Sequence, residues 1–135
     1  MKIFLDTIDL NEIRKYNDIL NIAGVTTNPN LARRFGMSDD IEMVREIAKV
    51  IGKTKEIHVE AFGDDFKEIV KNSERIKKNC SNLNLVFKIP FSEEGVKAAK
   101  FLKKNKYSTN LHLIFSISQA IISSSINSNY ICPLI

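Results

Sequence analysis

The sequence predicts an α/β protein built around a parallel sheet. Segments of strand character and helix character alternate about six times at a spacing of about 25 residues, the pattern of successive βαβ units. Residues 85–90 (LVFKIP) form a nearly unbroken apolar run, as in a parallel strand buried on both faces. Polar residues recur near the carboxyl ends of the predicted strands, which converge on one face in a TIM (β/α)₈ barrel. We therefore expect an incomplete barrel of this type, with about six of the eight units.

The first third of the chain predicts two strands and two helices. The strands are expected at residues 2–6 and 22–26, and Asp9 can cap an amphipathic helix between them. A polar turn follows the second strand. Within it, Pro29 suits the first position of a short helix that runs through Phe35.

The next segment predicts a longer helix and a third strand. Ser38 is expected to cap the helix, with Asp39 and Asp40 in its first turn, where acidic side chains are favourable. Gly52 is expected to close it. The third strand is predicted at residues 56–62 (EIHVEAF).

The second half of the chain continues the alternation around the strand at residues 85–90. A helix is expected to open at residues 63–65, and another is expected to be capped by Ser92. A fifth strand is predicted at residues 109–115 and a sixth at residues 130–135. The serine-rich segment 118–126 predicts a helix between them, although serine is a weak helix former.

Composition indicates one compact cytoplasmic domain over residues 1–135. A chain of 135 residues with 44% hydrophobic content can bury one core. The net charge of +4 comes from short clusters on predicted helix faces, so nucleic-acid binding is not expected. No apolar run approaches the length that spans a membrane. Cys80 and Cys132 lack metal-site spacing, which suggests reduced thiols, and no metal is expected.

Lys88 is the only charged residue in the apolar run at 85–90. An ammonium group held in a buried strand loses hydration, and burial therefore favours the neutral amine, the form that attacks a carbonyl to make a Schiff base. The alternative is a structural lysine whose head group reaches solvent. This stretch by itself leaves both interpretations open.

Asp6, Asn28, Glu60, Lys88 and Asn110 are predicted near the carboxyl ends of five strands. A lysine with two carboxylates and two carboxamides suits Schiff-base chemistry. The lysine adds to a ketone, a carboxylate transfers protons, and the iminium ion accepts the electrons of a breaking carbon–carbon bond. Taken one at a time, the other four residues could equally be turn formers, loop amides or solvated strand ends.

Six blocks of sequence carry a family resemblance. FLDT, GVTTNP, HVE, LVFKIPFSEEG, TNLHLIFSISQA and YICPL resemble, in the same order and spacing, the small transaldolase family with its fructose-6-phosphate aldolase relatives. The resemblance covers nearly the whole chain. It implies phosphorylated sugar substrates and neither a metal nor an organic cofactor.

The resemblance also implies roles for the strand-end residues. Lys88 matches the Schiff-base lysine, and Asp6 matches the aspartate that assists proton transfer during carbon–carbon cleavage. Glu60 matches the glutamate that activates the catalytic water in transaldolases, where the aldolase relatives carry glutamine. Asn28 and Asn110 match residues that bind the dihydroxyacetone portion of the substrate. Thr26, in the GVTTNP block, is also expected to join the substrate-binding residues.

The sequence departs from the family pattern at a few positions. His112 stands where the family has a threonine that holds the catalytic water, so its imidazole could position that water or only fill the space. If it transferred protons, activity would depend on pH near the usual imidazole pKa, about 6.5. Cys132 replaces a serine or alanine, and the family's phosphate-binding arginine would follow residues 134–135.

The resemblance implies a transaldolase of the pentose phosphate pathway. Sedoheptulose 7-phosphate and glyceraldehyde 3-phosphate would give erythrose 4-phosphate and fructose 6-phosphate. Fructose-6-phosphate aldolase is one alternative, although Glu60 is not glutamine and Leu134 replaces the aldolases' tyrosine. A non-catalytic truncated remnant is the other. The first and sixth strands would present unpaired edges, so we expect a homo-oligomer or other self-association.

Overall fold

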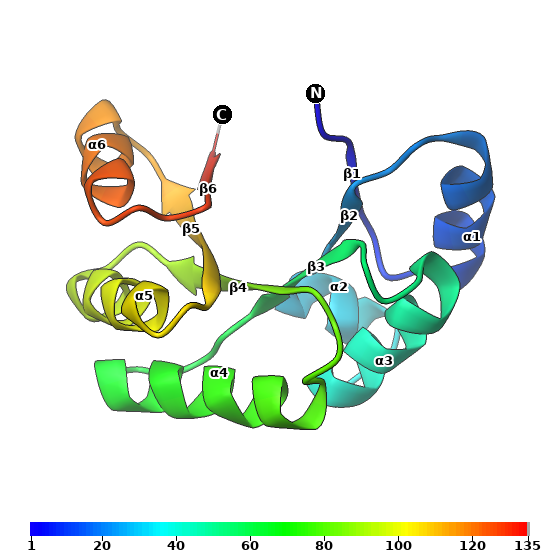
Figure 1. Ribbon diagram of the computed structural model, residues 1–135, viewed down its shortest axis with the longest axis horizontal. Helices are drawn as coiled ribbons and strands as arrows, with labels where there is room; N and C mark the ends of the chain where they lie inside the picture. The colour runs from blue at the N-terminus through cyan, green and yellow to red at the C-terminus, as the bar shows by residue number, and fades with distance from the viewer. Residues whose placement is uncertain (135) are drawn as a thin grey trace. The chain divides into compact units, whose positions relative to one another are not determined.

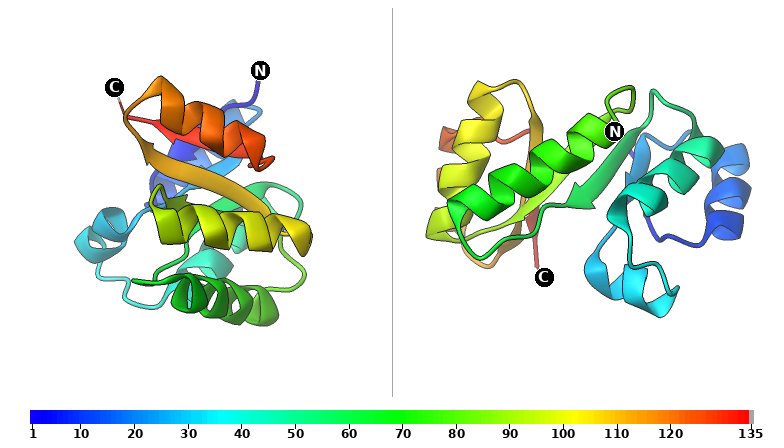
Figure 2. Two further views of the ribbon diagram at one scale, coloured as in Figure 1. Left: turned by 90° about the vertical axis from the view of Figure 1, so that its left-hand side faces the viewer. Right: turned by 90° about the horizontal axis from the view of Figure 1, so that it is seen from below.

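The computed structural model describes residues 1–134 (Figures 1 and 2). Six strands alternate with the helices, and the strand order in the sheet is the chain order. Parallel neighbouring strands in chain order, each followed by helix, are the arrangement of the (β/α)₈ barrel, so the predicted fold class is confirmed with six units present. The elements are β1 (Phe4–Asp6), α1 (Leu10–Ile19), β2 (Gly24–Thr26), α2 (Pro29–Arg34), α3 (Asp40–Ile51), β3 (Glu56–Glu60), α4 (Phe66–Asn79), β4 (Leu85–Pro90), α5 (Glu93–Lys104), β5 (Ser108–Ile114), α6 (Ile117–Ser125) and β6 (Tyr130–Pro133).

The chain divides into two compact units. The N-terminal unit comprises residues 1–60 and 76–85, and the C-terminal unit comprises residues 61–75 and the chain from Val86 onward. The N-terminal unit therefore holds β1, β2 and β3, and the C-terminal unit holds most of β4 together with β5 and β6.

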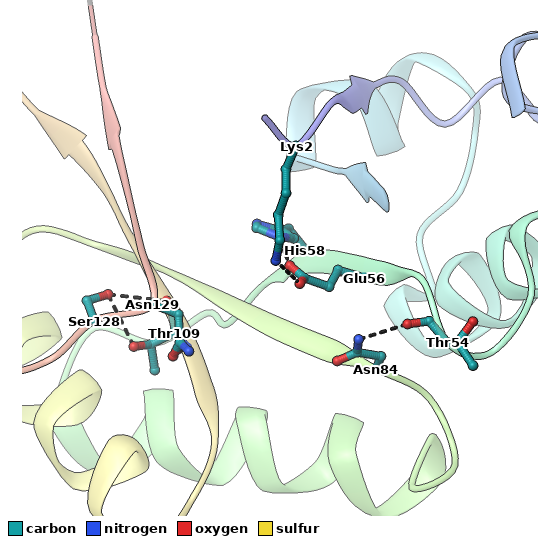
Figure 3. Close-up of polar contacts among 8 residues, drawn as sticks. All are labelled: Lys2, Thr54, Glu56, His58, Asn84, Thr109, Ser128 and Asn129. Atoms are coloured by element: carbon teal, nitrogen blue, oxygen red, sulfur yellow. Dashed lines mark hydrogen bonds and ion pairs between the residues drawn. The ribbon is translucent and has the colours of Figure 1, made fainter. Parts of the chain in front are cut away.

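In the N-terminal unit, β1 and β2 pair in parallel, as do β2 and β3. Their register aligns Leu5 with Val25 and Val25 with Ile57, and the latter two are buried. Figures 1 and 2 show α1 and α3 side by side next to these strands. Asn84 ties the chain before β4 to β3, because its side chain donates to the Thr54 carbonyl at 2.9 Å and its own carbonyl accepts from the Ile57 N–H at 2.9 Å (Figure 3).

The start of α3 differs from the prediction. Asp39, rather than Ser38, is the N-cap, and its carboxylate accepts hydrogen bonds from the backbone N–H groups of Ile41 at 2.8 Å and Glu42 at 3.3 Å. A carboxylate satisfies the free N–H groups of the first turn and also interacts favourably with the positive end of the helix. Gly52 closes the helix as predicted, with φ of 87°.

Several other boundaries were misplaced by one or two residues. β1 and β2 each start two residues later than predicted, and β5 runs from Ser108 to Ile114 rather than from 109 to 115. The sixth strand was predicted to run to residue 135, which lies outside the described residues, and β6 ends at Pro133.

α6 starts at Ile117, one residue before the predicted Ser118. Ser116 caps it, and the Ser116 and Gln119 side chains form a reciprocal capping box that fixes this start. β3 ends at Glu60 rather than at residue 62, so the carboxylate lies at the last strand position.

In the C-terminal unit, β4 pairs with β5 and β5 pairs with β6, all in parallel. Ser92 caps α5 as predicted, its hydroxyl accepting from the Gly95 N–H at 3.0 Å. A β-carbon built on Gly95 would lie 2.0 Å from the Pro90 carbonyl oxygen. Only glycine therefore lets the first turn of α5 lie this close to the end of β4.

Cys80 is buried, Cys132 is exposed, and both are free thiols. Burial raises the pKa of the Cys80 thiol. Across residues 1–134, no helix has both the length and the apolar content that a bilayer crossing requires.

Candidate active site

Asp6 and Thr26 are brought together in the N-terminal unit. They are register partners at the carboxyl ends of β1 and β2. The Thr26 hydroxyl donates to the Asp6 carboxylate at 2.8 Å. Asp6 is exposed, so its carboxylate is both oriented by a neighbour and open to a reactant. This is the placement expected of a group that transfers protons.

Asn28 follows β2 and caps α2. Its carboxamide oxygen accepts from the Leu31 N–H at 2.9 Å, and Pro29 occupies the first turn of the helix as predicted. Asn28 therefore does have a structural role of the kind considered in the sequence analysis, because its side chain bonds to nearby backbone. Because the oxygen is committed to the helix, the side-chain NH₂ group is what Asn28 can offer a ligand.

Glu60 was predicted near the carboxyl end of the third strand; it is the last residue of β3 and is half-buried. Side chains alternate along a strand, which places Glu56, His58 and Glu60 on one face and Ile57 and Val59 on the other. The second face is apolar and buried. β3 therefore carries its two carboxylates and its imidazole on the same face of the strand.

His58 and its partners form a cluster that the sequence analysis did not identify. The His58 Nε2 lies 3.3 Å from a Glu56 carboxylate oxygen, and the other oxygen accepts from the Lys2 ammonium at 2.8 Å (Figure 3). The imidazole packs edge-on against Phe4, with ring centroids 4.8 Å apart. The alternation of Glu56, His58 and Glu60 was the available signal, but nothing in the sequence indicated Lys2 as a partner.

Lys88 lies inside β4 of the C-terminal unit. It is 7% exposed, and its strand neighbours Phe87 and Ile89 are buried. Most of the Lys88 side chain is therefore removed from solvent. Lys88 lies two positions before the last strand residue, Pro90, so it occupies an interior strand position rather than the end itself.

Asn110 is the register partner of Lys88, and His112 is the register partner of Pro90. Partners in a parallel pair project from the same face of the sheet. β6 extends both rows. The rows are Lys88, Asn110 and Tyr130, and Pro90, His112 and Cys132.

The register of β6 is fixed by polar residues just before it. The Asn129 side chain accepts from the Thr109 N–H at 3.1 Å, and the Ser128 hydroxyl lies 3.2 Å from the Thr109 hydroxyl (Figure 3). The Ser128 hydroxyl also donates to the Tyr130 carbonyl at 2.9 Å. These contacts hold Tyr130 as the register partner of Asn110. The sequence analysis did not predict this pairing.

His112 is half-buried and neutral at neutral pH. Burial of the ring, and secondarily the positive charge of Lys88, lower the pKa of His112 to about 4. The ordinary imidazole pKa of about 6.5, on which the expected pH dependence was based, therefore does not apply to this ring. The sequence revealed neither the burial of the ring nor its cationic neighbour. A neutral imidazole offers one N–H donor and one nitrogen acceptor, as a water-holding group requires.

An irregularity in β5 follows His112 directly. The register with β6 shifts between His112 and Ile114, and Leu113 adopts a left-handed φ of 59°. This conformation is costly for a residue other than glycine, and such bulges often redirect side chains beside active sites. No residue pattern around Leu113 indicated this irregularity.

The side chains described above offer groups for nucleophilic and acid–base chemistry. Among residues 1–134, no three or more histidine, cysteine, aspartate or glutamate side chains are arranged to hold a metal ion. The C-terminal unit supplies a buried lysine, an imidazole and a carboxamide, and the N-terminal unit supplies carboxylates and a carboxamide. Such groups suit nucleophilic addition to a carbonyl with proton transfer.

Comparison with known proteins assigns the family. Residues 3–135 match the family model described as transaldolase/fructose-6-phosphate aldolase. The chain is 38% identical over 135 residues to a "Probable transaldolase" of Clostridium kluyveri, and 33% identical over 133 residues to a "Probable fructose-6-phosphate aldolase" of Streptococcus pneumoniae. These matches cover 100% and 98% of this chain, and the chain spans 60% of the length of each relative. The chain belongs to the transaldolase and fructose-6-phosphate aldolase family.

Proposed function

We propose that the chain acts as a transaldolase through a Schiff base on Lys88. It would move a dihydroxyacetone unit from sedoheptulose 7-phosphate to glyceraldehyde 3-phosphate, giving erythrose 4-phosphate and fructose 6-phosphate. The observation that carries the proposal is the burial of Lys88 in β4 with Asn110 as its register partner. A lysine in such a place has a functional explanation more readily than a structural one, because buried lysines are rare.

The Lys88 amine adds to the ketone carbonyl to give a carbinolamine, which loses water to become an iminium ion. Asp6 takes the proton from the hydroxyl on the carbon that becomes the aldehyde, at the far end of the bond that breaks. As the new aldehyde C=O forms and the aldose phosphate leaves, the electron pair of the broken carbon–carbon bond forms the C=C of an enamine, and the iminium π pair moves to the lysine nitrogen. The enamine then attacks the acceptor aldehyde, and the reverse steps release the product.

The other predicted residues serve this sequence of steps. Thr26 orients Asp6 through its hydroxyl and belongs to the substrate-binding group. Asn28 and Asn110 bind the hydroxyls of the dihydroxyacetone unit through their carboxamides. Glu60 activates the water that enters and leaves the carbinolamine, and the neutral imidazole of His112 holds that water by a hydrogen bond.

Fructose-6-phosphate aldolase is the second candidate, and the similarity to the relative from Streptococcus pneumoniae favours it. This activity would use the same Lys88 Schiff base, but the enamine would be protonated at carbon instead of attacking an acceptor aldehyde, and water would then hydrolyse the iminium to free dihydroxyacetone and the lysine amine. Glu60 favours transaldolase, because the resemblance assigns glutamine to that position in the aldolases. We place either activity in the cytoplasm, without a cofactor.

Borohydride trapping tests the proposed Schiff base. Reduction of the chain in the presence of fructose 6-phosphate should attach the three-carbon unit to the peptide that contains Lys88. Lys88→Met should abolish the label, and Lys100→Met, at an exposed position of α5, should not. A label on another lysine would refute the assignment, and a family member without catalytic activity would show no label at all.

Product analysis separates the two activities. With erythrose 4-phosphate as acceptor, a transaldolase converts fructose 6-phosphate into sedoheptulose 7-phosphate and glyceraldehyde 3-phosphate. An aldolase releases dihydroxyacetone whether or not the acceptor is present. Glu60→Gln should move the product ratio toward dihydroxyacetone if Glu60 has the proposed role.

A further inference from the structure

β3 buries an imidazole where a structural core would place an apolar side chain. Glu56, His58 and Glu60 share one face of the strand, and the resemblance assigns a role to Glu60 alone. His58 is 1% exposed. Burying a polar ring costs free energy unless its polar atoms are bonded, whereas an apolar residue would carry no such cost. Departures of this kind concentrate at functional sites.

The His58 ring is held on two sides. Its Nε2 lies 3.3 Å from a carboxylate oxygen of Glu56, and Lys2 binds the second oxygen of that carboxylate at 2.8 Å (Figure 3). Phe4 packs against the ring at a centroid distance of 4.8 Å. Glu56 thus cannot rotate freely, and the imidazole orientation is fixed through it.

The backbone at His58 is held as firmly as the ring. The Thr27 N–H and the Thr27 hydroxyl both donate to the His58 carbonyl, at 3.0 Å and 2.9 Å. β2 also lies very close to β3 one row away, since a β-carbon on Gly24 would be 2.0 Å from the Glu56 carbonyl oxygen. The imidazole therefore belongs to a rigid, pre-organised part of the N-terminal unit.

The register relates this imidazole to both proposed proton-transfer groups. Thr26 is the partner of Asp6 on one side and of His58 on the other, so the three form one row. Thr26 is bonded to Asp6 at 2.8 Å. Glu60 is two residues beyond His58 on the same face of the same strand. His58 thus shares a sheet row with Asp6 and Thr26 and a strand face with Glu60.

We propose that His58 is a positioning residue for Glu60 and for the Asp6–Thr26 pair, an inference that rests on the proposed function. His58 does not contact the substrate. Its bond to Glu56 fixes the polar face of β3, and this fixes the direction in which the Glu60 carboxylate meets the catalytic water. Misplacement of a catalytic group by about 1 Å can cost about 100-fold in rate. The loss should fall mainly on kcat, because Asn28 and Asn110 still bind the dihydroxyacetone unit.

Two variants separate the bond to Glu56 from the packing of the ring. His58→Phe keeps an aromatic ring against Phe4 but removes the bond, and His58→Gln supplies an amide that can donate to Glu56 again. Transaldolase kinetics on the chain should show kcat about 10- to 100-fold lower for His58→Phe, with KM within about twofold of the original, and partial recovery for His58→Gln. Glu42→Gln, an exposed carboxylate on α3, is the matched control and should leave both constants unchanged.

Borohydride trapping at Lys88 in the same proteins distinguishes this inference from the proposed function. We expect the unchanged chain and His58→Phe to carry the same amount of the three-carbon unit at Lys88 once labelling has gone to completion, while only His58→Phe turns over slowly. If the unchanged chain traps nothing at Lys88, the proposed function fails and the positioning role fails with it. If trapping occurs but kcat is equal in both proteins, or His58→Gln is no faster than His58→Phe, the positioning role alone is refuted.

Discussion

Replacing His112 with threonine should make the folded chain less sensitive to acid. Burial and the charge of Lys88 lower the pKa of His112 from 6.5 to about 4 in the folded state. Between these two pH values the unfolded chain binds a proton at this imidazole and the folded chain does not. Stability therefore rises with pH across this window and is lost as the pH falls from about 6.5 to about 4.

The size of the effect follows from the same two values. The difference between 6.5 and about 4 corresponds to about 3.4 kcal/mol, at about 1.36 kcal/mol for each pH unit. Because the ring is only half-buried, water screens part of this, and we expect a loss of about 1 to 2 kcal/mol on acidification. That is a substantial part of the roughly 5 to 15 kcal/mol that stabilises a typical domain.

Urea unfolding measures this loss. The chain has no tryptophan, so circular dichroism is the suitable signal. Unfolding free energies at about pH 7, about pH 5.5 and about pH 4.5 should fall more steeply for the unchanged chain than for His112→Thr. All other titrating groups, His58 included, are common to both proteins and cancel in the comparison.

A third protein separates the two causes of the low pKa. Lys88→Met removes the cationic neighbour but leaves the ring buried, and burial is the larger cause. The acid-induced loss should therefore become smaller and should not disappear. Identical pH profiles for the unchanged chain and His112→Thr would refute the reasoning, and a complete loss of the effect in Lys88→Met would show that charge, not burial, dominates.

Two further predictions concern packing and association. Gly95→Ala should lower the free energy of unfolding in urea by about 1 to 3 kcal/mol, despite alanine's better helix propensity, because its β-carbon would lie 2.0 Å from the Pro90 carbonyl oxygen. Gly36→Asn, in open space at φ of 66°, is the control and should change the free energy of unfolding by less than about 0.5 kcal/mol. A Gly95→Ala protein as stable as the original would contradict the close approach. The chain should self-associate through α6, where Ile117 and Ile121 are 81% and 63% exposed one turn apart. Sedimentation velocity should show this and should show less of it after Ile117→Lys and Ile121→Lys, whereas a monodisperse monomer would exclude it.

The elements of the fold could be predicted because hydrophobic period and capping residues are local properties. Each predicted strand and helix has a counterpart, and the errors lie at their ends. Ser38 and Asp39 are both good caps one residue apart, so sequence alone could not choose between them. Ser116 was missed because its partner in the capping box, Gln119, lies inside the serine-rich segment.

The candidate site was less predictable because its geometry depends on distant partners. The apolar run around Lys88 indicated burial, and the structure bears this out. The hydrogen bond between Lys2 and Glu56 joins residues 54 positions apart, and no local sequence pattern predicts it. The left-handed backbone at Leu113 could not be predicted either, since leucine does not favour that conformation.

The alternation of side chains explains how the chain can change its chemistry without changing its core. On β3 the residues on one face are ionisable while Ile57 on the other is buried, and on β4 Lys88 stands between the buried Phe87 and Ile89. A register slip of one residue would exchange the two faces, so packing of the apolar face fixes the position of every polar side chain. A polar residue can then be replaced while the apolar face still sets the register. In this way His112 can occupy the place of the threonine that the resemblance assigns to the family. The effect of His112→Thr should then appear in proton binding and not in the arrangement of the strands.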